Sequence, residues 1–300
     1  MWKKILVRGL SLILLLALVA GGYVFFQVNA YNDSMAKTYD VAPLDIKAAT
    51  DPAAIERGRH LSRSLAGCAL SDCHGADLGG GKTMKAGPIG TITAPNITRV
   101  AQAYSDGRLA RLIRYGIKKD GRSVRFMPCN EFGWLPDSDV AAVIGYIRTV
   151  KPVDRPNGPM KLGIMAKVLD RRGEFDVDVA RKVVSKPIDL GPAPSATKKY
   201  GSYVARLCTG CHGKHLGGGP LPGAPPDFAV PRNLTPDPTG LGKDYSYEQF
   251  TKLIEDGIKK DGTKADPMMP IAALQGMNDT ERHALYAYLR SVKPRPFGSR

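Results

Sequence analysis

The stretch Cys208-Thr209-Gly210-Cys211-His212 decides how this 300-residue chain folds and what it holds. Two cysteines separated by two residues and followed directly by histidine are typical of a c-type haem attachment site. The thiols form thioethers to the porphyrin edge, and the histidine binds the iron from one side. A zinc site would need a second Cys/His pair at ligand spacing, and a redox CxxC would need a βαβ context. The sequence has neither, so we predict that Cys208 and Cys211 attach a haem c and that His212 is an axial ligand.

The sequence also repeats itself. Residues 104–121 (YSDGRLARLIRYGIKKDG) match residues 245–262 (YSYEQFTKLIEDGIKKDG), and residues 143–152 (VIGYIRTVKP) match residues 285–294 (LYAYLRSVKP). His74-Gly75 and a glycine-rich loop correspond to His212-Gly213 and a similar loop. Agreement over separate blocks indicates a duplication. We therefore predict two side-by-side domains of the same fold.

Each copy is predicted to be helical, with long Gly- and Pro-rich loops and no strands. Apolar spacing predicts helices at about residues 52–65 and 195–207 and after the N-caps Ser105 and Ser246, with Gly116 and Gly257 as stops. The last helix of each copy is expected to begin at Asp137 and Asn278 and to close before Pro152 and Pro294. The segment between the copies is interpreted as a linker with a short helix at 161–171, in which Met160 and Met165 serve as apolar packing. The predicted fold class is all-α.

The amino terminus is predicted to direct export. Lys3, Lys4 and Arg8 precede an almost purely apolar stretch at residues 10–26. That length is closer to a spanning helix of about 20 residues than to a signal-peptide core. We favour a retained transmembrane helix over cleavage after Ala30, with everything beyond it on the outer side.

The formal charge of +15 limits the classes of partner that this chain is expected to bind. Such a basic chain suits nucleic acid, anionic lipid or an acidic protein. No basic run is interleaved with aromatic residues, so we expect no nucleic-acid binding. Lys118, Lys119, Lys259 and Lys260 are candidates to face an acidic docking surface, against the alternative of a simply solvated positive surface. The five cysteines do not form the paired pattern of a disulfide framework.

The first copy has an altered attachment site. At the position of CTGCH it reads Cys68-Ala69-Leu70-Ser71-Asp72-Cys73-His74, two residues longer. Because His74 and the glycine-rich loop are retained, we expect this copy to hold haem as well, through Cys68 and Cys73 in a bulged loop. Two alternatives stay open: a single thioether through Cys73 that frees Cys68 to pair with Cys129, and loss of the haem. Cys129 is otherwise interpreted as a small buried apolar residue.

Each iron needs a sixth ligand. Met127-Pro128 and Met269-Pro270 follow the Asp-Gly of their copies at matching places. A thioether opposite histidine raises the potential and fills the coordination sphere, which favours electron transfer over oxygen chemistry. We predict Met127 and Met269 as these ligands, although Met268 is adjacent. Asn96 and Asn233 are candidates to bind a propionate or to cap a loop, whereas His60 and His283 are interpreted as packing or surface residues.

These motifs resemble those of membrane-anchored bacterial diheme cytochromes c of the class I cytochrome c superfamily. The resemblance rests on ERGR at residues 56–59, CALSDCHG, CTGCHG, both Met-Pro pairs and the closing YIRTVKP and YLRSVKP. It implies cytochrome c domains at residues 51–153 and 194–300, a membrane helix at 1–30, linkers at 31–50 and 154–193, and a terminal helix packed on the helix before each haem motif. It further implies two covalently bound haem c groups with His74/Met127 and His212/Met269 as axial pairs.

The function implied is electron transfer without a catalytic residue. Two six-coordinate haems would carry single electrons between a donor and an acceptor, with a dehydrogenase, an oxidase or a small cytochrome or cupredoxin as partner. The expected location is the bacterial inner membrane, with the haem domains in the periplasm. The alternative is a diheme peroxidase, which needs one iron with an open site, and the matching Met-Pro pairs argue against it.

Overall fold

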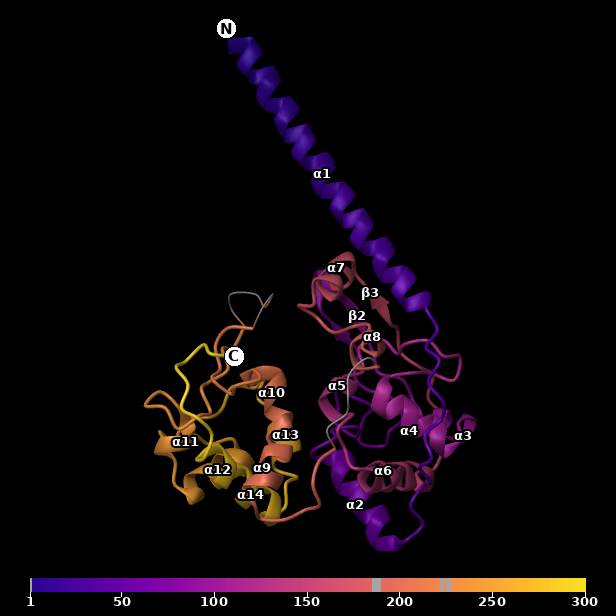
Figure 1. The fold of residues 1–300 in the computed structure, drawn as a ribbon, viewed down its shortest axis with the longest axis vertical. Coiled ribbons are helices and arrows are strands. Elements are labelled where there is room, and N and C mark those ends of the chain that lie inside the picture. Colours follow the sequence, from indigo (N-terminus) through magenta and orange to yellow (C-terminus); the bar gives the residue numbers. More distant parts are fainter. Residues whose placement is uncertain (1, 185–189, 222–223, 225–227) are drawn as a thin grey trace.

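In the computed structural model, the chain forms one long helix and two helical halves that lie side by side (Figure 1). The structure describes residues 2–184, 190–221, 224 and 228–300. We call residues 51–153 the first half and residues 194–300 the second half. The predicted linker lies between them, and its residues 185–189 are outside the described part.

The elements follow one another in a mostly helical order, as predicted. After α1 (Trp2–Ala36), the first half contains α2 (Pro52–Arg63), β1 (Met84–Lys85), the 3-10 helix η1 (Gly87–Ile89), β2 (Gly90–Ile92), α3 (Ile97–Ala103), α4 (Asp106–Tyr115), α5 (Cys129–Phe132) and α6 (Asp137–Thr149). The connecting segment contributes β3 (Lys161–Leu162), α7 (Ile164–Arg172) and α8 (Ala180–Val183). The second half contains α9 (Lys198–Val204), α10 (Arg206–His212), α11 (Leu241–Asp244), α12 (Tyr247–Asp256), α13 (Ile271–Leu274) and α14 (Asp279–Leu289).

The connecting segment is more than a linker. Its β3 completes a small antiparallel sheet of order β1-β2-β3, in which Thr91 pairs with Lys161. The prediction of no strands was therefore wrong, because strands of two or three residues are too short to show alternation. The predicted short helix exists as α7, but Met165 is 49% exposed and does not serve as packing.

The two halves share one helix crossing. In the first half α2 packs along α6, and in the second α9 packs along α14, as the resemblance implied. Both crossings need a glycine: a Cβ on Gly58 would lie 1.9 Å from the carbonyl oxygen of Ala142, and one on Gly201 would lie 1.9 Å from that of Ala284. The backbones of each pair therefore approach as closely as a bare Cα permits.

Replacing Gly201 with alanine is expected to lower the free energy of unfolding by about 3 kcal/mol, since the backbone of α14 cannot yield as a flexible side chain would. Chemical denaturation of the full chain measures this loss. The neighbouring Ser202→Ala serves as the control, because it removes only a hydrogen bond to Lys199 within α9 and is expected to cost under ~1 kcal/mol. Equal stabilities of the two variants would contradict the tight crossing.

Local signals place the other helices well. Gly116 and Gly257 end α4 and α12 in the left-handed conformation, with φ of 66° and 67°. The predicted Ser246 cap forms a capping box with Gln249, and α14 has another between Asn278 and Glu281. The helix predicted at 195–207 is instead split at Ala205 into α9 and α10, so that the haem motif itself is helical.

The core continues from one half into the other through buried aromatic residues. Trp134 and Tyr203 meet edge to face with ring centroids 4.4 Å apart, and Tyr203 stacks on Tyr200 at 5.2 Å. Aromatic pairs in such arrangements add to the free energy gained by burial alone. The two halves are thus packed together in one arrangement.

A buried polar group, which we call the interface cluster, crosses the same boundary. Its members are Arg57 and His60 of α2, Asp139 of α6, Tyr200 and Tyr203 of α9, and Glu281 of α14. Arg57 donates to Asp139 at 3.1 Å and to Glu281 at 3.0 Å, and His60 Nε2 lies 2.8 Å from Glu281. The interpretation of His60 as a packing or surface residue was therefore wrong, because its ring contacts the buried Glu281. Its partner lies in the other half, beyond the reach of any local pattern.

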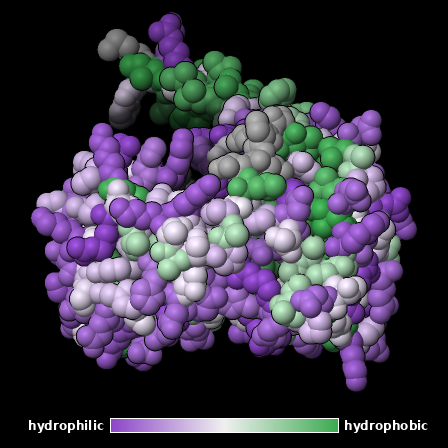
Figure 2. Space-filling model, turned by 60° about the horizontal axis from the view of Figure 1, so that its bottom comes forward, coloured by the Kyte–Doolittle hydropathy of each residue, from purple (hydrophilic) through white to green (hydrophobic). Residues whose placement is uncertain are grey.

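The apolar stretch of the long helix α1 stands apart from both halves, whereas its last residues pack against α7 and the first half. It is long and apolar enough to cross a bilayer, and none of its apolar window is buried in the protein. Its exposed apolar side chains gather as a green group beside the mostly purple surface of the halves (Figure 2). The helix does not end at residue 30 but runs on to Ala36, because Tyr31 is buried against Ala166 of α7.

Candidate haem-binding sites

Helix α10 positions the attachment residues of the second half. Cys208 and Cys211 are three residues apart on this helix, which places both thiols on one side of it. Burial and then the neighbouring Cys211 raise the pKa of Cys208 to about 12. The thiols of Cys208 and Cys211 are therefore close to each other, and the Cys208 thiol is protonated at neutral pH.

The orientation of His212 is set by a backbone carbonyl. Its Nδ1 lies 2.6 Å from the carbonyl oxygen of Arg232. A carbonyl can only accept, so Nδ1 carries the proton and Nε2 keeps its lone pair. Burial lowers the pKa of His212, which keeps the imidazole neutral. A neutral ring with a fixed tautomer is the form that ligates a metal.

The first half repeats this arrangement. His74 Nδ1 lies 2.8 Å from the carbonyl oxygen of Pro95, and burial lowers the pKa of His74 as well. The loops after the two histidines also have the same backbone conformation. Leu78 and Leu216, at matching positions, both have a positive φ, of 57° and 60°. The carbonyl oxygens of His74 and His212 accept from Gly80 and Gly218 at 2.8 and 2.9 Å.

The longer Cys68–His74 loop is folded as a series of turns. The NH of Ala69 donates to Ser62, and the NH groups of Cys73 and Gly75 both donate to Leu70. Ala69 is buried whereas Ser71 and Asp72 are exposed, so the start of the loop is anchored in the core and its bulge lies at the surface. Burial and the nearby Cys73 raise the pKa of Cys68 to about 12, as happens for Cys208. The two thiols of the longer loop are thus neighbours in space.

Cys68 and Cys129 are both free thiols in the structure. Cys129 is fully buried, as expected for a small apolar residue, and its Sγ lies 3.5 Å from the carbonyl oxygen of Leu112. Burial and, to a smaller extent, the nearby Cys68 raise the pKa of Cys129, so these two thiols also lie near each other.

Asn96 and Asn233 cap the loops that carry the two carbonyl acceptors. Asn233 Oδ1 accepts from the NH of Thr235 at 2.9 Å, and its Nδ2 donates to the carbonyl of Arg295 at 2.7 Å. Asn96 Oδ1 accepts from Thr98 in the same way and its Nδ2 donates to Val153. Each asparagine is buried and follows the residue whose carbonyl meets the histidine. Of the two roles that we had considered, the structure shows loop capping.

The two Met-Pro segments have the same backbone turn. The carbonyl of Met127 accepts from Cys129 at 2.8 Å, and that of Met269 accepts from Ile271 at 2.7 Å. Both methionines are half-buried and pack on the core, whereas Met268 is 57% exposed. Met269 is therefore better placed than Met268 to face the interior of its half.

The residues present fit two c-type haems by the chemistry of their donors. Each half supplies a pair of neighbouring thiols, a neutral imidazole with a free Nε2 and an inward methionine. Since the described part of the chain has no cluster of three or more His, Cys, Asp or Glu residues at metal-binding spacing, a bare metal ion is a poorer match.

The two sites approach each other across the halves. A cavity of about 400 Å³ is lined by Leu70, Ser71 and Asp72 of the first-site loop and by Met269 with its neighbours in the second half. Leu70, Ser71 and Asp72 of the longer first-site loop thus lie beside the methionine loop of the second half.

Comparison with known proteins agrees with this geometry. The cytochrome c family model matches residues 200–293. The quinone-type alcohol dehydrogenase cytochrome c subunit of Gluconacetobacter polyoxogenes is 39% identical over 110 residues, which is 34% of this chain and 23% of that protein. The gluconate 2-dehydrogenase cytochrome c subunit of Pantoea cypripedii is 40% identical over 111 residues, 34% of this chain and 25% of that protein. The fructose dehydrogenase cytochrome subunit of Gluconobacter japonicus is 34% identical over 123 residues, 37% of this chain and 25% of that protein.

These matches span about a quarter of the length of the relatives. They agree with the attachment motif on α10, the oriented His212 and the helical fold around them. Residues 200–293 therefore form a cytochrome c domain.

Proposed function

We propose that this chain is a membrane-anchored diheme cytochrome c that accepts single electrons from a dehydrogenase and passes them to a further acceptor. Cys68, Cys73, His74 and Met127 would hold one haem c, and Cys208, Cys211, His212 and Met269 the other. A haem with histidine and methionine ligands supplies a one-electron couple without an open coordination position.

The observation that carries this proposal is the matched pair of oriented histidines. Pro95 and Arg232 hold the Nδ1 atoms of His74 and His212, so both halves present Nε2 for ligation. A half that had lost its haem would gain nothing from keeping its histidine buried and neutral. The relatives named above are cytochrome subunits of dehydrogenases, and no observation favours the peroxidase alternative.

The fold also suits transfer from one site to the other. The interface cluster holds α2 and α6 of the first half against α9 and α14 of the second. Because this arrangement is fixed, the distance between the two sites stays constant. The donor and the acceptor then need no rearrangement before each electron transfer.

The long apolar α1 supports a location in the inner membrane with both halves in the periplasm. Lys3, Lys4 and Arg8 would stay in the cytoplasm by the positive-inside rule. Tethering in this way confines the search for a membrane-bound donor to two dimensions.

Purification from native membranes tests the proposed function. We expect a dehydrogenase to co-purify with this chain, and its substrate to reduce the haem absorbance of the complex. The contrary result is a cytochrome that purifies alone, shows a high-spin haem and turns over peroxide.

Electron transfer with an acidic partner is expected to slow steeply as ionic strength rises, because the chain carries a formal charge of +15 and salt screens steering. Replacing Lys119 and Lys260 with glutamine should lower the low-salt rate constant several-fold, whereas Lys47→Gln, on the amino-terminal connection, should leave it unchanged. Stopped-flow reduction at a series of salt concentrations measures this. A rate constant that does not change with salt concentration would show that the partner has no acidic docking surface.

A further inference from the structure

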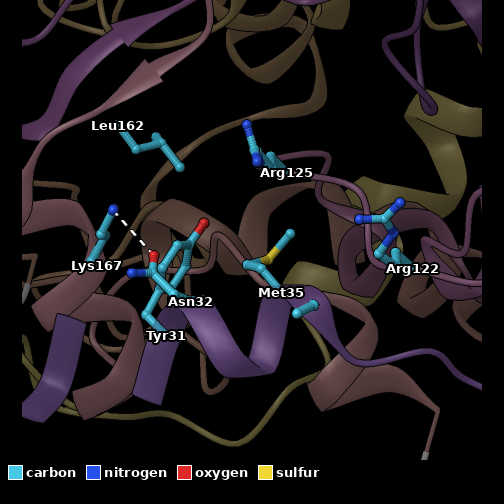
Figure 3. A pocket seen from close by; sticks show the side chains of 8 residues that line it. Tyr31, Asn32, Met35, Arg122, Arg125, Leu162 and Lys167 are labelled. Carbon is cyan, nitrogen blue, oxygen red and sulfur yellow. Dashed lines mark hydrogen bonds between the residues drawn. The ribbon is translucent and has the colours of Figure 1, made fainter. Parts of the chain in front are cut away.

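A cavity of about 300 Å³ lies where α1 leaves its apolar stretch and meets the first half. Figure 3 shows the lining side chains. They are Tyr31, Asn32, Met35 and Ala36 of α1, with Arg122, Arg125, Leu162 and Lys167. Three of them are cationic and none is acidic, so the cavity favours an anion.

Tyr31 supplies an unusual feature of this cavity. It is 3% exposed, and its hydroxyl has no hydrogen-bond partner among the described residues. In Figure 3 its oxygen points into the space between Lys167 and Arg125. A buried hydroxyl without a partner is costly. Its direction into a basic cavity indicates that a ligand oxygen accepts from it.

Two of the three cations are available, because Arg122 pairs with Asp120 at 3.0 Å. Lys167 Nζ donates to the Asn32 side chain at 3.2 Å and lies 5.6 Å from the Tyr31 ring centroid. Arg125 is exposed, and its guanidinium forms no ion pair with the part of the chain that the structure describes. A guanidinium and an ammonium around one hydroxyl suit a phosphate, which the planar Arg fork can bind through two oxygens. Asp170 and Asp178 also act electrostatically on Tyr31, but neither lines the cavity, both are buried and Arg181 pairs with them.

The position of the cavity along α1 indicates that the phosphate comes from a lipid headgroup. The apolar stretch of α1 ends at Phe26, and Tyr31 lies about 7.5 Å farther along the axis at 1.5 Å per residue. The headgroup region outside the hydrocarbon core is about 5–7.5 Å thick on each side. Tyr23, Phe25 and Phe26 are exposed just below, where aromatic side chains favour the interface.

The connecting segment offers a complementary apolar contact at the same place. Ile164 and Met165 begin α7, which packs along α1, and they are 61% and 49% exposed. On an aqueous surface such neighbours would be unfavourable, whereas at the boundary of a bilayer they can insert.

We propose that this cavity binds the phosphate of an anionic phospholipid in the outer leaflet, with Tyr31, Arg125 and Lys167 as its contacts. The lipid would fix the angle between α1 and the first half and so set the height of both sites above the membrane. This inference rests on the proposed membrane anchor.

The test uses the full haem-loaded chain in nanodiscs of phosphatidylcholine that contain a minor fraction of phosphatidylglycerol. After mild detergent extraction, native mass spectrometry counts the retained lipids. We expect one phosphatidylglycerol per chain for the wild type and for the control Lys198→Gln/Lys199→Gln. Retention should fall roughly tenfold or more for Arg125→Gln/Lys167→Gln, given the attraction of each basic residue to anionic lipid, and several-fold for Tyr31→Phe.

Several outcomes would overturn the site. Equal retention of phosphatidylcholine, or unchanged retention by the variants, shows that the cavity does not recognise an anionic headgroup. Displacement of the lipid by millimolar inorganic phosphate shows a free-anion site instead. Flotation of the chain with the nanodiscs is measured first: failure to float overturns the anchor and the lipid site together, whereas flotation without retention overturns the lipid site alone.

Discussion

Replacing Glu281 with alanine is expected to lower the free energy of unfolding by about 3–5 kcal/mol, because it removes the buried carboxylate that His60 contacts and leaves the half-buried Arg57 with Asp139 alone. Glu281 is fully buried and accepts from Arg57 and Tyr200 at 3.0 and 3.3 Å. It also contacts His60 and closes the capping box of α14 with Asn278. The two halves should separate more easily in this variant, and thermal and denaturant unfolding of the full chain measure the effect.

A matched control separates burial from charge. Glu255 pairs with Arg282 at 2.9 Å but has a side chain that is 41% exposed. Glu255→Ala should therefore cost under ~1 kcal/mol, as surface pairs do. A loss for Glu281→Ala no larger than that of Glu255→Ala would show that the interface cluster does not hold the halves together.

The same carboxylate makes stability depend on pH. Burial by itself would raise the pKa of Glu281, but the hydrogen bond and charge of His60, the NH of Asn278 and the Arg57 guanidinium together lower it. A carboxyl group whose pKa is lower in the folded protein stabilises it above the ordinary glutamate range and loses this contribution as the pH falls through the folded pKa. We expect wild-type stability to decline on acidification and Glu281→Gln to show a weaker decline.

Replacing Met127 or Met269 with leucine is expected to lower the reduction potential of one haem by on the order of 0.1 V, since axial ligands tune haem potentials over ~0.8 V. Thioether sulfur opposite histidine raises the potential, and its loss opens a coordination position. Each variant should lose the methionine–iron charge-transfer band of its own half only. Optical redox titration of the purified full chain measures both quantities.

Met268→Leu is the control for the second half. Met268 is exposed, whereas the adjacent Met269 packs on the core. We expect Met268→Leu to leave the spectrum and the potentials unchanged. If Met268→Leu removes the band and Met269→Leu does not, the assignment of the sixth ligand is wrong.

Local sequence signals predicted much of the fold. The cap at Ser246 and the stops at Gly116 and Gly257 depend on residues close in sequence, and each appears in the structure as expected. The crossing of α2 with α6 and of α9 with α14 followed from the resemblance. The duplicated blocks also predicted that the two histidine loops would be alike, and their hydrogen bonds and φ values agree.

Features that depend on distant partners could not be predicted. His60 and Glu281 are separated by 221 positions, so no local pattern reveals their contact. The split between α9 and α10 and the small sheet depend on tertiary packing that overrides local propensity. The helix α1 continues past residue 30 because α7, about 130 residues later, covers Tyr31.

In the candidate sites, side chains were easier to find than the backbone groups that orient them. Cys208, Cys211 and His212 form a covalent pattern that any fold must respect. The carbonyls of Pro95 and Arg232 carry no side-chain signal and became visible only in the structure. The repeated Asn-x-Thr at Asn96 and Asn233 was the available clue, because each asparagine caps the turn that directly follows its carbonyl.

Both halves of the molecule are proposed to attach a haem, and the intact mass of the denatured chain tests this most directly. We predict the mass of the polypeptide plus two haem groups, with one haem on the proteolytic peptide that contains Cys68 and Cys73 and the other on the peptide that contains Cys208 and Cys211. A mass increment of a single haem, confined to the peptide from the second half, would contradict the account.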